Sequence, residues 1–410
     1  MQNKCASASD VAAPKKVVSA QNRWAGIVRR GRSRGFPQMV NPALMRSNKK
    51  FGSARRLRLK QIRQGRENKA AMTPQPSLRE EATHAGILGV GMAVPEHVLT
   101  NEELSRRVDT TDEWIASRTG IRERRVADEA TATSDLATAA SLNALTNAGV
   151  DAEELDLVLC ATTSGDYIWP ATACIVQGRI GAKSAAAFDL SAACSGFCYS
   201  LATAAAFIQS GAMKRILVIG ADTLTKQLNW EDRGTCILFG DGAGAAVLGP
   251  CGGEEGILSS VLAADGGGVE AIWIPAGGTR TPSTPETIAQ RLNCISMQGK
   301  EVYRFAVNIV PEVIHEALKR ACLTPADIDL LVMHQANVRI MRAASDRLGV
   351  PWEKVFVNLE RYGNTSAGSI PIALAEAQAQ RRLQRGSIVV TVGFGAGLTW
   401  AANVIRWSRD

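Results

Sequence analysis

The stretch DLSAACSGFCYSLATAAAF, residues 189–207, joins the end of an apolar segment to a long alanine-rich run with helical spacing. Cys194, Ser195 and Gly196 stand at the junction. A cysteine at the start of a helix has a lowered pKa, because backbone N–H groups and the helix dipole favour the thiolate. The pattern therefore predicts a reactive nucleophile. The alternative is a buried core thiol, which is the commoner role of a cysteine in apolar surroundings.

The same strand-to-helix pattern occurs again later in the chain, at a nearly constant offset. After residue 84, short apolar strands alternate with alanine-rich helices, which predicts an α/β architecture. The repetition predicts two copies of one unit, packed as a pseudo-twofold pair. The paired segments are 149–164 with 322–337, 188–196 with 357–368, and 215–222 with 387–395.

The strand-to-helix loops of both copies are expected to meet in one cleft, because ligands of α/β sheets gather at the carboxyl ends of the strands. Cys194, His334 and Asn364 all occupy such loops. Alone, His334 fits a satisfied core histidine and Asn364 a turn residue. Together, a thiolate and two neutral donors suit the formation of a thioester and the stabilisation of an enolate or oxyanion. No acidic residue occupies an equivalent loop, which argues against a cysteine-hydrolase triad.

The basic character of the chain is confined to its N-terminal part. The formal charge of the 410 residues is +8, but residues 1–84 contain 19 Lys and Arg against 4 Asp and Glu. The remainder is net acidic, at −7. An Arg-rich, Ser-containing segment that is nearly devoid of acids is typical of an organelle transit peptide, cleaved between residues 60 and 84. We expect the plastid stroma, with the mitochondrion as the alternative. The other interpretation is a basic arm for nucleic acid.

Several other classes of protein are disfavoured by the composition. Nine cysteines without a C-x-x-C pair and only four histidines indicate neither a disulfide framework nor a metal site. The apolar stretch 387–405 is interrupted by FGAG, which predicts two short strands and no membrane span. The stretch FGDGAGAAVLG, residues 239–249, does not match a phosphate-binding loop, and we predict a tight turn between two strands there.

Six motifs follow one another from about residue 85 to the C-terminus: VDTTDEWIASRTGIRERR, AFDLSAACSGF, DRGTCILFGDGAGAAVLG, MHQAN, YGNTSAGSIP and GFGAGLTW. With them, the chain resembles β-ketoacyl-[acyl-carrier-protein] synthase III, the initiating condensing enzyme of dissociated fatty acid synthesis. The resemblance implies a thiolase-like α/β fold, in which duplicated βαβαβαββ halves pack as a layered αβαβα sandwich. It divides the chain into a basic, disordered transit segment (1–84), an N-terminal half (85–255) and a C-terminal half (256–410).

The resemblance also implies how the three loop residues act. Cys194 takes an acetyl group from acetyl-CoA. His334 and Asn364 bind the thioester carbonyl of malonyl-[acyl-carrier protein] and stabilise the carbanion formed as CO2 leaves. The carbanion attacks the acyl-cysteine, and the product is acetoacetyl-[acyl-carrier protein]. Because decarboxylation generates the nucleophile, this acyltransferase needs neither a carboxylate base nor a cofactor. The backbone N–H groups of Cys194 and of the FGAG loop are implied as an oxyanion hole.

Further positions acquire roles only through the resemblance. A body of net charge −7 needs a local basic patch to attract an acidic carrier protein. Trp169 stands where well-known bacterial members have a phenylalanine that limits the acyl pocket of the partner protomer, so primer length stays open. The implied roles are coenzyme A binding (Trp114, Arg118, Arg233 and Asn337), the acyl pocket of a homodimer (Trp169 and Phe394) and docking of the carrier protein (Arg339).

Other condensing families differ in the residues that accompany the cysteine. Elongating synthases have two histidines, degradative thiolases have a second catalytic cysteine, and chalcone-type synthases lack the HQAN and DRGT segments. A synthase III relative that uses longer or branched primers in specialised metabolism stays open as an alternative. A non-catalytic binding module with this fold would be expected to lose one of Cys194, His334 and Asn364, and all three are present.

Overall fold

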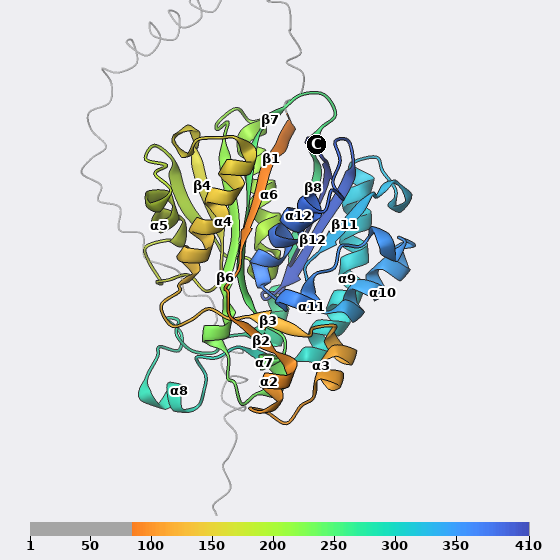
Figure 1. Cartoon of the computed structure of the whole chain (residues 1–410). Helices are drawn as coiled ribbons and strands as arrows, with labels where there is room; N and C mark the ends of the chain where they lie inside the picture. Colours follow the sequence, from red (N-terminus) through yellow and green to blue (C-terminus); the bar gives the residue numbers. More distant parts are fainter. Residues whose placement is uncertain (1–83, 410) are drawn as a thin grey trace, which may run out of the picture. The chain divides into compact units, whose positions relative to one another are not determined.

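Two sheets form the centre of the fold in the computed structural model, which describes residues 84–409 (Figure 1). All of the described residues belong to one compact unit. The first sheet has the order β1 (His84–Ala93), β7 (Asp241–Cys251), β6 (Ile216–Thr223), β4 (Leu157–Ala161) and β5 (Ala186–Leu190). The second has the order β11 (Leu330–Met333), β12 (Ile388–Gly395), β13 (Thr399–Arg406) and β8 (Gly256–Ala264).

The two sheets repeat one topology, as the sequence repeat predicts. In the first, β4 runs parallel to β6, while β6, β7 and β1 pair antiparallel in turn. In the second, β11 runs parallel to β12, while β12, β13 and β8 pair antiparallel in the same succession. In the first sheet, β4 also pairs in parallel with β5. In the second sheet, a single parallel bridge between Leu331 of β11 and Val355 takes the place of this pairing. The duplicated thiolase-like architecture is thereby confirmed.

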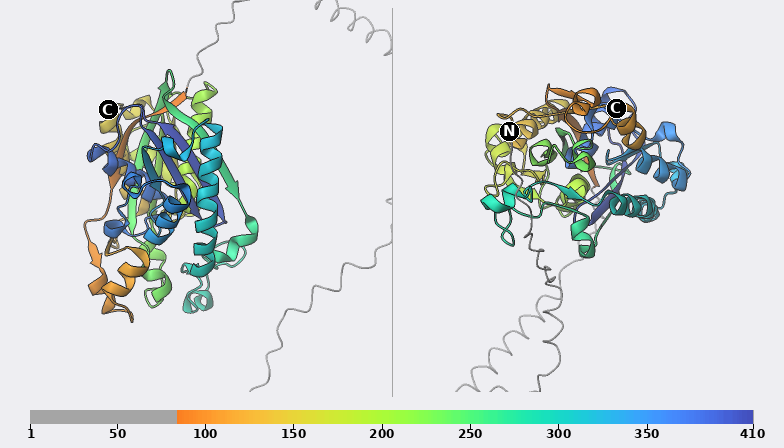
Figure 2. Two further views of the ribbon diagram at one scale, coloured as in Figure 1. Left: turned by 90° about the vertical axis from the view of Figure 1, so that its right-hand side faces the viewer. Right: turned by 90° about the horizontal axis from the view of Figure 1, so that it is seen from below.

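Helices complete five layers, visible in Figures 1 and 2. The outer pair α4 and α5 packs on the first sheet through an alanine-rich core. The helices α6 and α12 lie between the two sheets, and α9 and α10 cover the outer face of the second. The bounds are α4 Thr133–Ala148, α5 Thr172–Arg179, α6 Gly196–Gln209, α9 Gly299–Arg320, α10 Val338–Leu348 and α12 Ser369–Ala379.

Smaller elements gather at one end of the sheets, in the lower part of Figure 1. They lie at the carboxyl ends of β4, β6, β11 and β12, where ligands of α/β sheets bind. The elements are β2 (Val98–Thr100), α2 (Asn101–Ser105), α3 (Asp112–Thr119), β3 (Glu123–Arg125), α7 (Arg233–Cys236), β9 (Ile272–Trp273), α8 (Pro285–Ala289), β10 (Ser296–Met297) and α11 (Leu359–Tyr362).

The glycine-rich stretch 239–249 corrects the sequence-based prediction of a tight turn, since most of it lies within strand β7. Helix α12 crosses this strand so closely that a Cβ atom at Gly244 would lie 2.6 Å from the backbone nitrogen of Ile372. The small residues therefore serve helix-to-sheet packing. The predicted turn at FGAG does join two strands, β12 and β13.

Strands from residues 84–251 build the first sheet and strands from residues 256–406 build the second. The predicted domain bounds stay a prediction, and the basic segment predicted as a transit peptide lies outside the described residues. None of the helices within residues 84–409 combines the length and apolarity that crossing a bilayer requires.

Candidate active site

Cys194 lies in a tight turn between the two sheets. The 3-10 turn Ala193–Ser195 leads directly into α6, and Ala193 has a φ of +47°, which non-glycine residues rarely adopt. Strand β12 runs against this turn, where a Cβ atom at Gly395 would lie 2.8 Å from the nitrogen of Cys194. The glycine of the GFGAG motif therefore allows the second half of the fold to contact the cysteine.

The environment of the thiol contradicts the prediction of a lowered pKa. Cys194 is 6% exposed, and burial raises the pKa of its thiol to about 12. A hydrogen bond with the Ser366 side chain lowers the pKa, but burial is the larger effect. The sequence pattern located the helix N-terminus correctly but could not show how completely the sulfur is enclosed. With this pKa, the thiol is protonated at neutral pH.

This protonation state predicts a steep pH dependence for Cys194. We expect its alkylation by iodoacetamide to accelerate roughly tenfold per pH unit between about pH 6 and pH 9, because the thiolate is the nucleophile and each unit raises its fraction tenfold below the pKa. Mass spectrometry of the Cys194 peptide separates this site from exposed cysteines such as Cys174. A rate that levels off near pH 7 would show that the helix N-terminus outweighs burial.

His334 follows strand β11 and is fixed on several sides. Its backbone N–H donates to Val392 O (2.8 Å), and its ring packs edge-to-face on Phe394 with centroids 5.4 Å apart. Its Nδ1 lies 2.7 Å from the Ser369 hydroxyl oxygen, which leaves Nε2 for the cavity that the residue lines. Burial lowers the pKa of His334 to about 3, so the imidazole is neutral.

Gln335, next in the HQAN motif, holds this corner in place. Its side-chain nitrogen donates to Met333 O (2.8 Å) and Phe356 O (3.1 Å), and its oxygen accepts from the backbone N–H of Asn358 (3.1 Å). The residue is 1% exposed. The motif therefore combines a cavity-lining histidine with a buried amide that joins two segments of backbone.

The backbone around Asn364 sets the direction of its amide. Gly363 has a φ of +64°, and the backbone of Asn364 bonds to Leu238 O (2.8 Å) and to the N–H of Gly240 (3.0 Å). The Asn364 side-chain oxygen accepts from the backbone N–H of Ser366 (2.9 Å). With the oxygen occupied, the Nδ2 group is the part of the amide that can donate to a ligand.

Cys194, His334 and Asn364 line one cavity of about 210 Å³. They come from loops in both halves of the fold, which is the meeting predicted from the repeat. Phe394 lines the same cavity. A neutral imidazole and an amide N–H that line the same cavity as a thiol can stabilise negative charge on an oxygen of a bound thioester.

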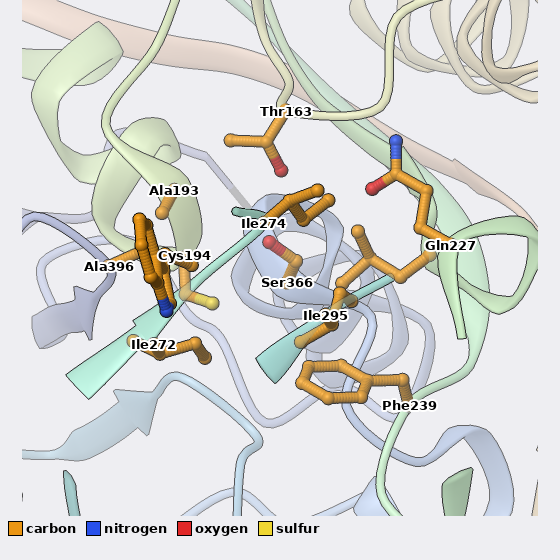
Figure 3. A pocket seen from close by; sticks show the side chains of 12 residues that line it. Thr163, Ala193, Cys194, Gln227, Phe239, Ile272, Ile274, Ile295, Ser366 and Ala396 are labelled. Carbon is orange, nitrogen blue, oxygen red and sulfur yellow. The ribbon is translucent and has the colours of Figure 1, made fainter. Parts of the chain in front are cut away.

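A second cavity, of about 260 Å³, also borders Cys194, whose sulfur points into it in Figure 3. Most of its lining residues are apolar, which suits a hydrocarbon chain attached to that sulfur. Sequence reasoning missed this lining because single apolar residues carry no distinguishing signal. The apolar members include Leu224, Phe239, Ile272, Ile274 and Ile295, and the polar members are Thr163, Gln227 and Ser366.

Neither residue predicted for the acyl pocket lines this second cavity. Phe394 faces His334 in the first cavity, because the strand alternation of β12 turns its ring away from the apolar side. Trp169 is 83% exposed on the loop between β4 and α5. Within a single described chain, the pocket is built without either of them.

Asp222 was also missed, although it connects the site. It is fully buried at the end of β6 and accepts hydrogen bonds from Ser164 Oγ (2.7 Å), Thr163 N (2.9 Å) and Ala367 N (3.2 Å). These bonds join the loop after β4 to the turn that contains Ser366, which borders Cys194 in the apolar cavity. The role of Asp222 is structural, because donors occupy its oxygens.

Of the four residues predicted to bind coenzyme A, Asn337 lines the 210 Å³ cavity, whereas Trp114, Arg118 and Arg233 do not. The guanidinium groups of Arg118 and Arg233 lie 4.3 and 4.7 Å from the centre of the Trp114 ring. Asn337 caps α10 by accepting from the N–H of Arg339 (2.8 Å) and donates to Arg118 O (3.0 Å). Stacked rings and guanidinium groups of this kind suit an adenine and its phosphates.

Arg339 lies at the start of α10, on a surface groove with Lys300, Arg304 and Tyr303. Its guanidinium lies 5.7 Å from the centre of the Tyr303 ring. Three cations on one groove form a local basic patch on a chain whose body is net acidic. Within residues 84–409, no group of three or more His, Cys, Asp or Glu side chains is arranged to hold a metal ion.

Comparison with known proteins agrees with this geometry. Residues 188–266 match the family described as 3-oxoacyl-[acyl-carrier-protein (ACP)] synthase III, and residues 318–407 match its C-terminal domain. The chain is 53% identical over 329 residues to the β-ketoacyl-[acyl-carrier-protein] synthase III of Caldanaerobacter subterraneus subsp. tengcongensis, covering 80% of this chain and 99% of that protein. It is 55% identical over 324 residues to the protein of the same name from Symbiobacterium thermophilum, covering 79% of this chain and 98% of that protein.

Solved structures give the same result. The synthase III of Thermus thermophilus superposes with a TM-score of 0.74 at 46% identity, and that of Aquifex aeolicus with 0.73 at 44%. Each comparison covers 79% of this chain and all of the other. The chain belongs to the β-ketoacyl-[acyl-carrier-protein] synthase III family.

Proposed function

We propose that this protein catalyses the initiating condensation of type II fatty acid synthesis: acetyl-CoA and malonyl-[acyl-carrier protein] give acetoacetyl-[acyl-carrier protein], CoA and CO2. The observation that carries the proposal is the convergence of Cys194, His334 and Asn364 on one cavity, with a mostly apolar second cavity that also borders Cys194. The direct test is incubation with acetyl-CoA alone, which should add one acetyl group to the Cys194 peptide. Acetylation elsewhere, or none, would contradict it.

In the first half-reaction, Cys194 loses its thiol proton and the resulting thiolate attacks the acetyl-CoA carbonyl. The carbon–sulfur bond to CoA then breaks, and the CoA sulfur leaves as a thiolate and takes up a proton, so that free CoA is a thiol. Ionisation has to overcome burial, and the hydrogen bond with Ser366 lowers the pKa of the thiol. Backbone N–H groups at the start of α6 and in the FGAG loop stabilise the tetrahedral oxyanion. The acyl group then occupies the apolar cavity.

In the second half-reaction, the malonyl thioester carbonyl accepts hydrogen bonds from Nε2 of His334 and Nδ2 of Asn364. The carbon–carbon bond to the carboxylate breaks, CO2 leaves, and the electron pair forms an enolate whose oxygen these donors stabilise. The enolate carbon attacks the acetyl carbonyl on Cys194, and the thiolate leaves. The neutral state of His334 suits a donor that keeps its proton throughout.

Coenzyme A is assigned to the cluster of Trp114, Arg118, Arg233 and Asn337. Arg233 is oriented by Asp109, whose backbone oxygen accepts from it at 2.6 Å. The guanidinium groups stacked on Trp114 present an aromatic and cationic surface to the nucleotide. The acidic carrier protein is assigned to the basic groove of Lys300, Arg304 and Arg339, since opposite charge accelerates docking.

A homodimer is proposed from the exposed surface near β5, which is an edge strand within the described chain. The adjoining loop exposes Tyr167, Ile168 and Trp169, of which Ile168 is 91% exposed. An apolar tip beside an unpaired edge is typical of an interface. We expect light scattering to give twice the chain mass, and Ile168→Lys to give a monomer. A monomeric parent protein would contradict the dimer.

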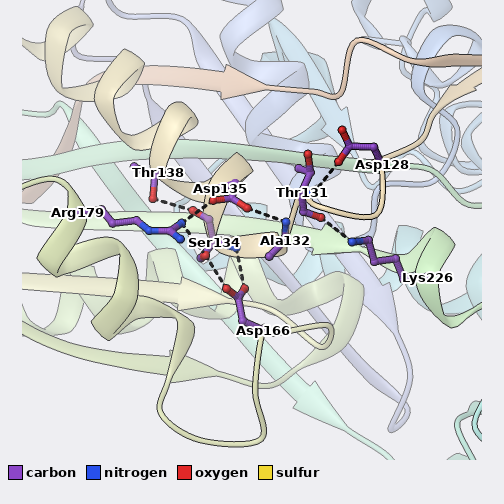
Figure 4. A network of polar contacts seen from close by, with 9 residues as sticks. All are labelled: Asp128, Thr131, Ala132, Ser134, Asp135, Thr138, Asp166, Arg179 and Lys226. Carbon is purple, nitrogen blue, oxygen red and sulfur yellow. Dashed lines mark hydrogen bonds and ion pairs between the residues drawn. The ribbon is translucent and has the colours of Figure 1, made fainter.

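Both ends of this loop are anchored although its tip is exposed. Asp166 accepts from Ser134 N (2.9 Å) and Ser134 Oγ (2.6 Å), and Arg179 donates to the same hydroxyl (2.8 Å), as Figure 4 shows. At the other end, Asp189 accepts from Thr172 N (2.7 Å). The anchors hold Trp169 in position for a second copy of the chain, where we propose that it closes the apolar pocket.

Trp169→Ala is therefore expected to relax primer length. Removing an indole from a pocket wall makes room for several methylene groups, and each is worth about 1–3 kcal/mol in a hydrophobic pocket. We expect the rate with octanoyl-CoA relative to acetyl-CoA to rise at least about tenfold. Ile288→Ala is the matched control, since Ile288 is also exposed and apolar but outside the loop. An unchanged ratio in Trp169→Ala would remove this residue from the pocket.

The cellular site is proposed to be the plastid stroma, with the mitochondrion as the alternative. The curated relatives match over 98–99% of their length, while about a fifth of this chain lies outside the match. The Arg-rich composition of residues 1–84 supports import into an organelle. Imaging of a fluorescent fusion to residues 1–84 would decide between plastid and mitochondrion, and cytosolic fluorescence would exclude both.

A further inference from the structure

The hydrogen bonds behind the His334 ring determine which of its nitrogens carries the proton. The Ser369 hydroxyl oxygen lies 2.7 Å from Nδ1 of His334, and the backbone N–H of Gln335 donates to the same oxygen at 3.4 Å. Within residues 84–409, these are the two hydrogen bonds that this hydroxyl makes. Ser369 is 2% exposed at the first position of α12, so bulk water does not compete.

A hydroxyl group has one proton to donate. The backbone N–H of Gln335 can only donate, so the hydroxyl oxygen serves it as acceptor. If Nδ1 of His334 also donated, the hydroxyl proton would be buried without an acceptor, which is unfavourable because a buried polar group loses its hydrogen bond to water without replacement. If the hydroxyl donates to Nδ1 instead, all three groups are satisfied. The proton of the neutral ring then resides on Nε2, on the side of the cavity.

We propose that Ser369 is a positioning residue that holds His334 in the tautomer protonated at Nε2, so that His334 donates to the malonyl carbonyl and cannot accept a proton from Cys194. This inference rests on the proposed function of the site. It separates the two half-reactions: His334 acts in decarboxylation and condensation, while ionisation of Cys194 depends on its own turn and Ser366.

The opposite tautomer would reverse these roles. A neutral imidazole with its proton on Nδ1 presents an acceptor at Nε2, which repels the thioester carbonyl and can act as a base toward a thiol. The Asn364 side chain is also fixed as a donor, because its oxygen accepts from the backbone N–H of Ser366 and its nitrogen is left to donate. Two side chains of the same cavity, His334 and Asn364, are therefore left with a donor for one substrate oxygen.

The test combines nitrogen NMR with the two half-reactions measured separately. Histidine labelled with 15N gives four residues to resolve, and a His334→Asn sample assigns one of them. Acetylation of Cys194 and release of CO2 from malonyl-[acyl-carrier protein] are then measured in Ser369→Ala, in Ser369→Thr, which keeps the hydroxyl, and in Ser345→Ala. Ser345 is the matched control, since its equally buried hydroxyl donates to Val350 O (2.6 Å) away from the site.

We expect wild-type His334 to show a protonated Nε2 and an unprotonated Nδ1. In Ser369→Ala, CO2 release should fall at least about tenfold, toward the ~10²–10³-fold loss expected when one oxyanion donor is removed. Acetylation should stay within about threefold, Ser369→Thr should restore decarboxylation, and Ser345→Ala should change neither rate.

A wild-type spectrum with the proton on Nδ1 would overturn the proposal, whatever the variants do and even if Ser369→Ala does not fold. Equal losses in both half-reactions, or normal CO2 release in Ser369→Ala, would also overturn it. If the wild-type protein performs neither half-reaction, the proposed function fails, and the NMR measurement still decides the tautomer.

Discussion

Replacing Asn364 or His334 with alanine is expected to abolish CO2 release from malonyl-[acyl-carrier protein] while acetylation of Cys194 continues. Each residue supplies one donor to the enolate oxygen, and removing one such donor costs about 2.7–4 kcal/mol, or about 10²–10³ in rate. Neither contributes to attack on acetyl-CoA in the proposed mechanism. Measuring the half-reactions separately is what makes the prediction specific.

Matched controls exist for both variants. His315→Ala removes an exposed histidine from α9, and Asn308→Ala removes an exposed asparagine from the same helix. Both should keep decarboxylation at the parent rate. If His334→Ala or Asn364→Ala releases CO2 at the parent rate, the residue has no part in stabilising the enolate.

Cys194→Ser is expected to lose condensation by at least about 10³-fold, because a serine hydroxyl without a general base is a far weaker nucleophile than a thiolate. Decarboxylation should continue in this variant, because the donors His334 and Asn364 are unchanged. CO2 release then becomes uncoupled from product formation. Cys198→Ser is the control, because Cys198 lies one turn further along α6 and is fully buried. Product formation at the parent rate in Cys194→Ser would rule out an acyl-cysteine intermediate.

The sequence predicts the architecture well because the fold repeats. The paired segments around Cys194 and Asn364 have the same order of strand, turn and helix, and the sheets reproduce one pairing pattern. A repeat places the loops of both halves at one cleft without knowledge of any side-chain contact. The three central residues of the site could therefore be predicted together.

Properties that depend on packing density could not be predicted. The pKa of Cys194 is raised because the sulfur is enclosed by segments far apart in the chain, among them the Ser366 turn. The glycines of β7 predict a turn from the sequence alone. In the structure Gly244 lies against α12, a contact with a distant segment that the local sequence does not indicate. In both cases, a local pattern is overridden by the close approach of a distant element.

Residues that position others have no local signature either. Ser369 belongs to a small-residue motif that fits any helix start, and Asp222 ends an apolar strand. Only their contacts, with His334 in one case and with Thr163, Ser164 and Ala367 in the other, show what they hold in place. The apolar lining of the second cavity is unpredictable for the same reason.

The most direct test of the central claim is the initial rate of 3-oxoacyl-[acyl-carrier protein] formation by the purified full-length protein. The assay supplies malonyl-[acyl-carrier protein] with a series of acyl-CoA primers, and Cys194→Ser is measured beside the parent. We predict rapid turnover with acetyl-CoA that is lost in Cys194→Ser. Turnover with longer or branched primers alone would contradict the initiating role and assign the protein to specialised metabolism, and no turnover with any primer would leave Cys194 a buried thiol.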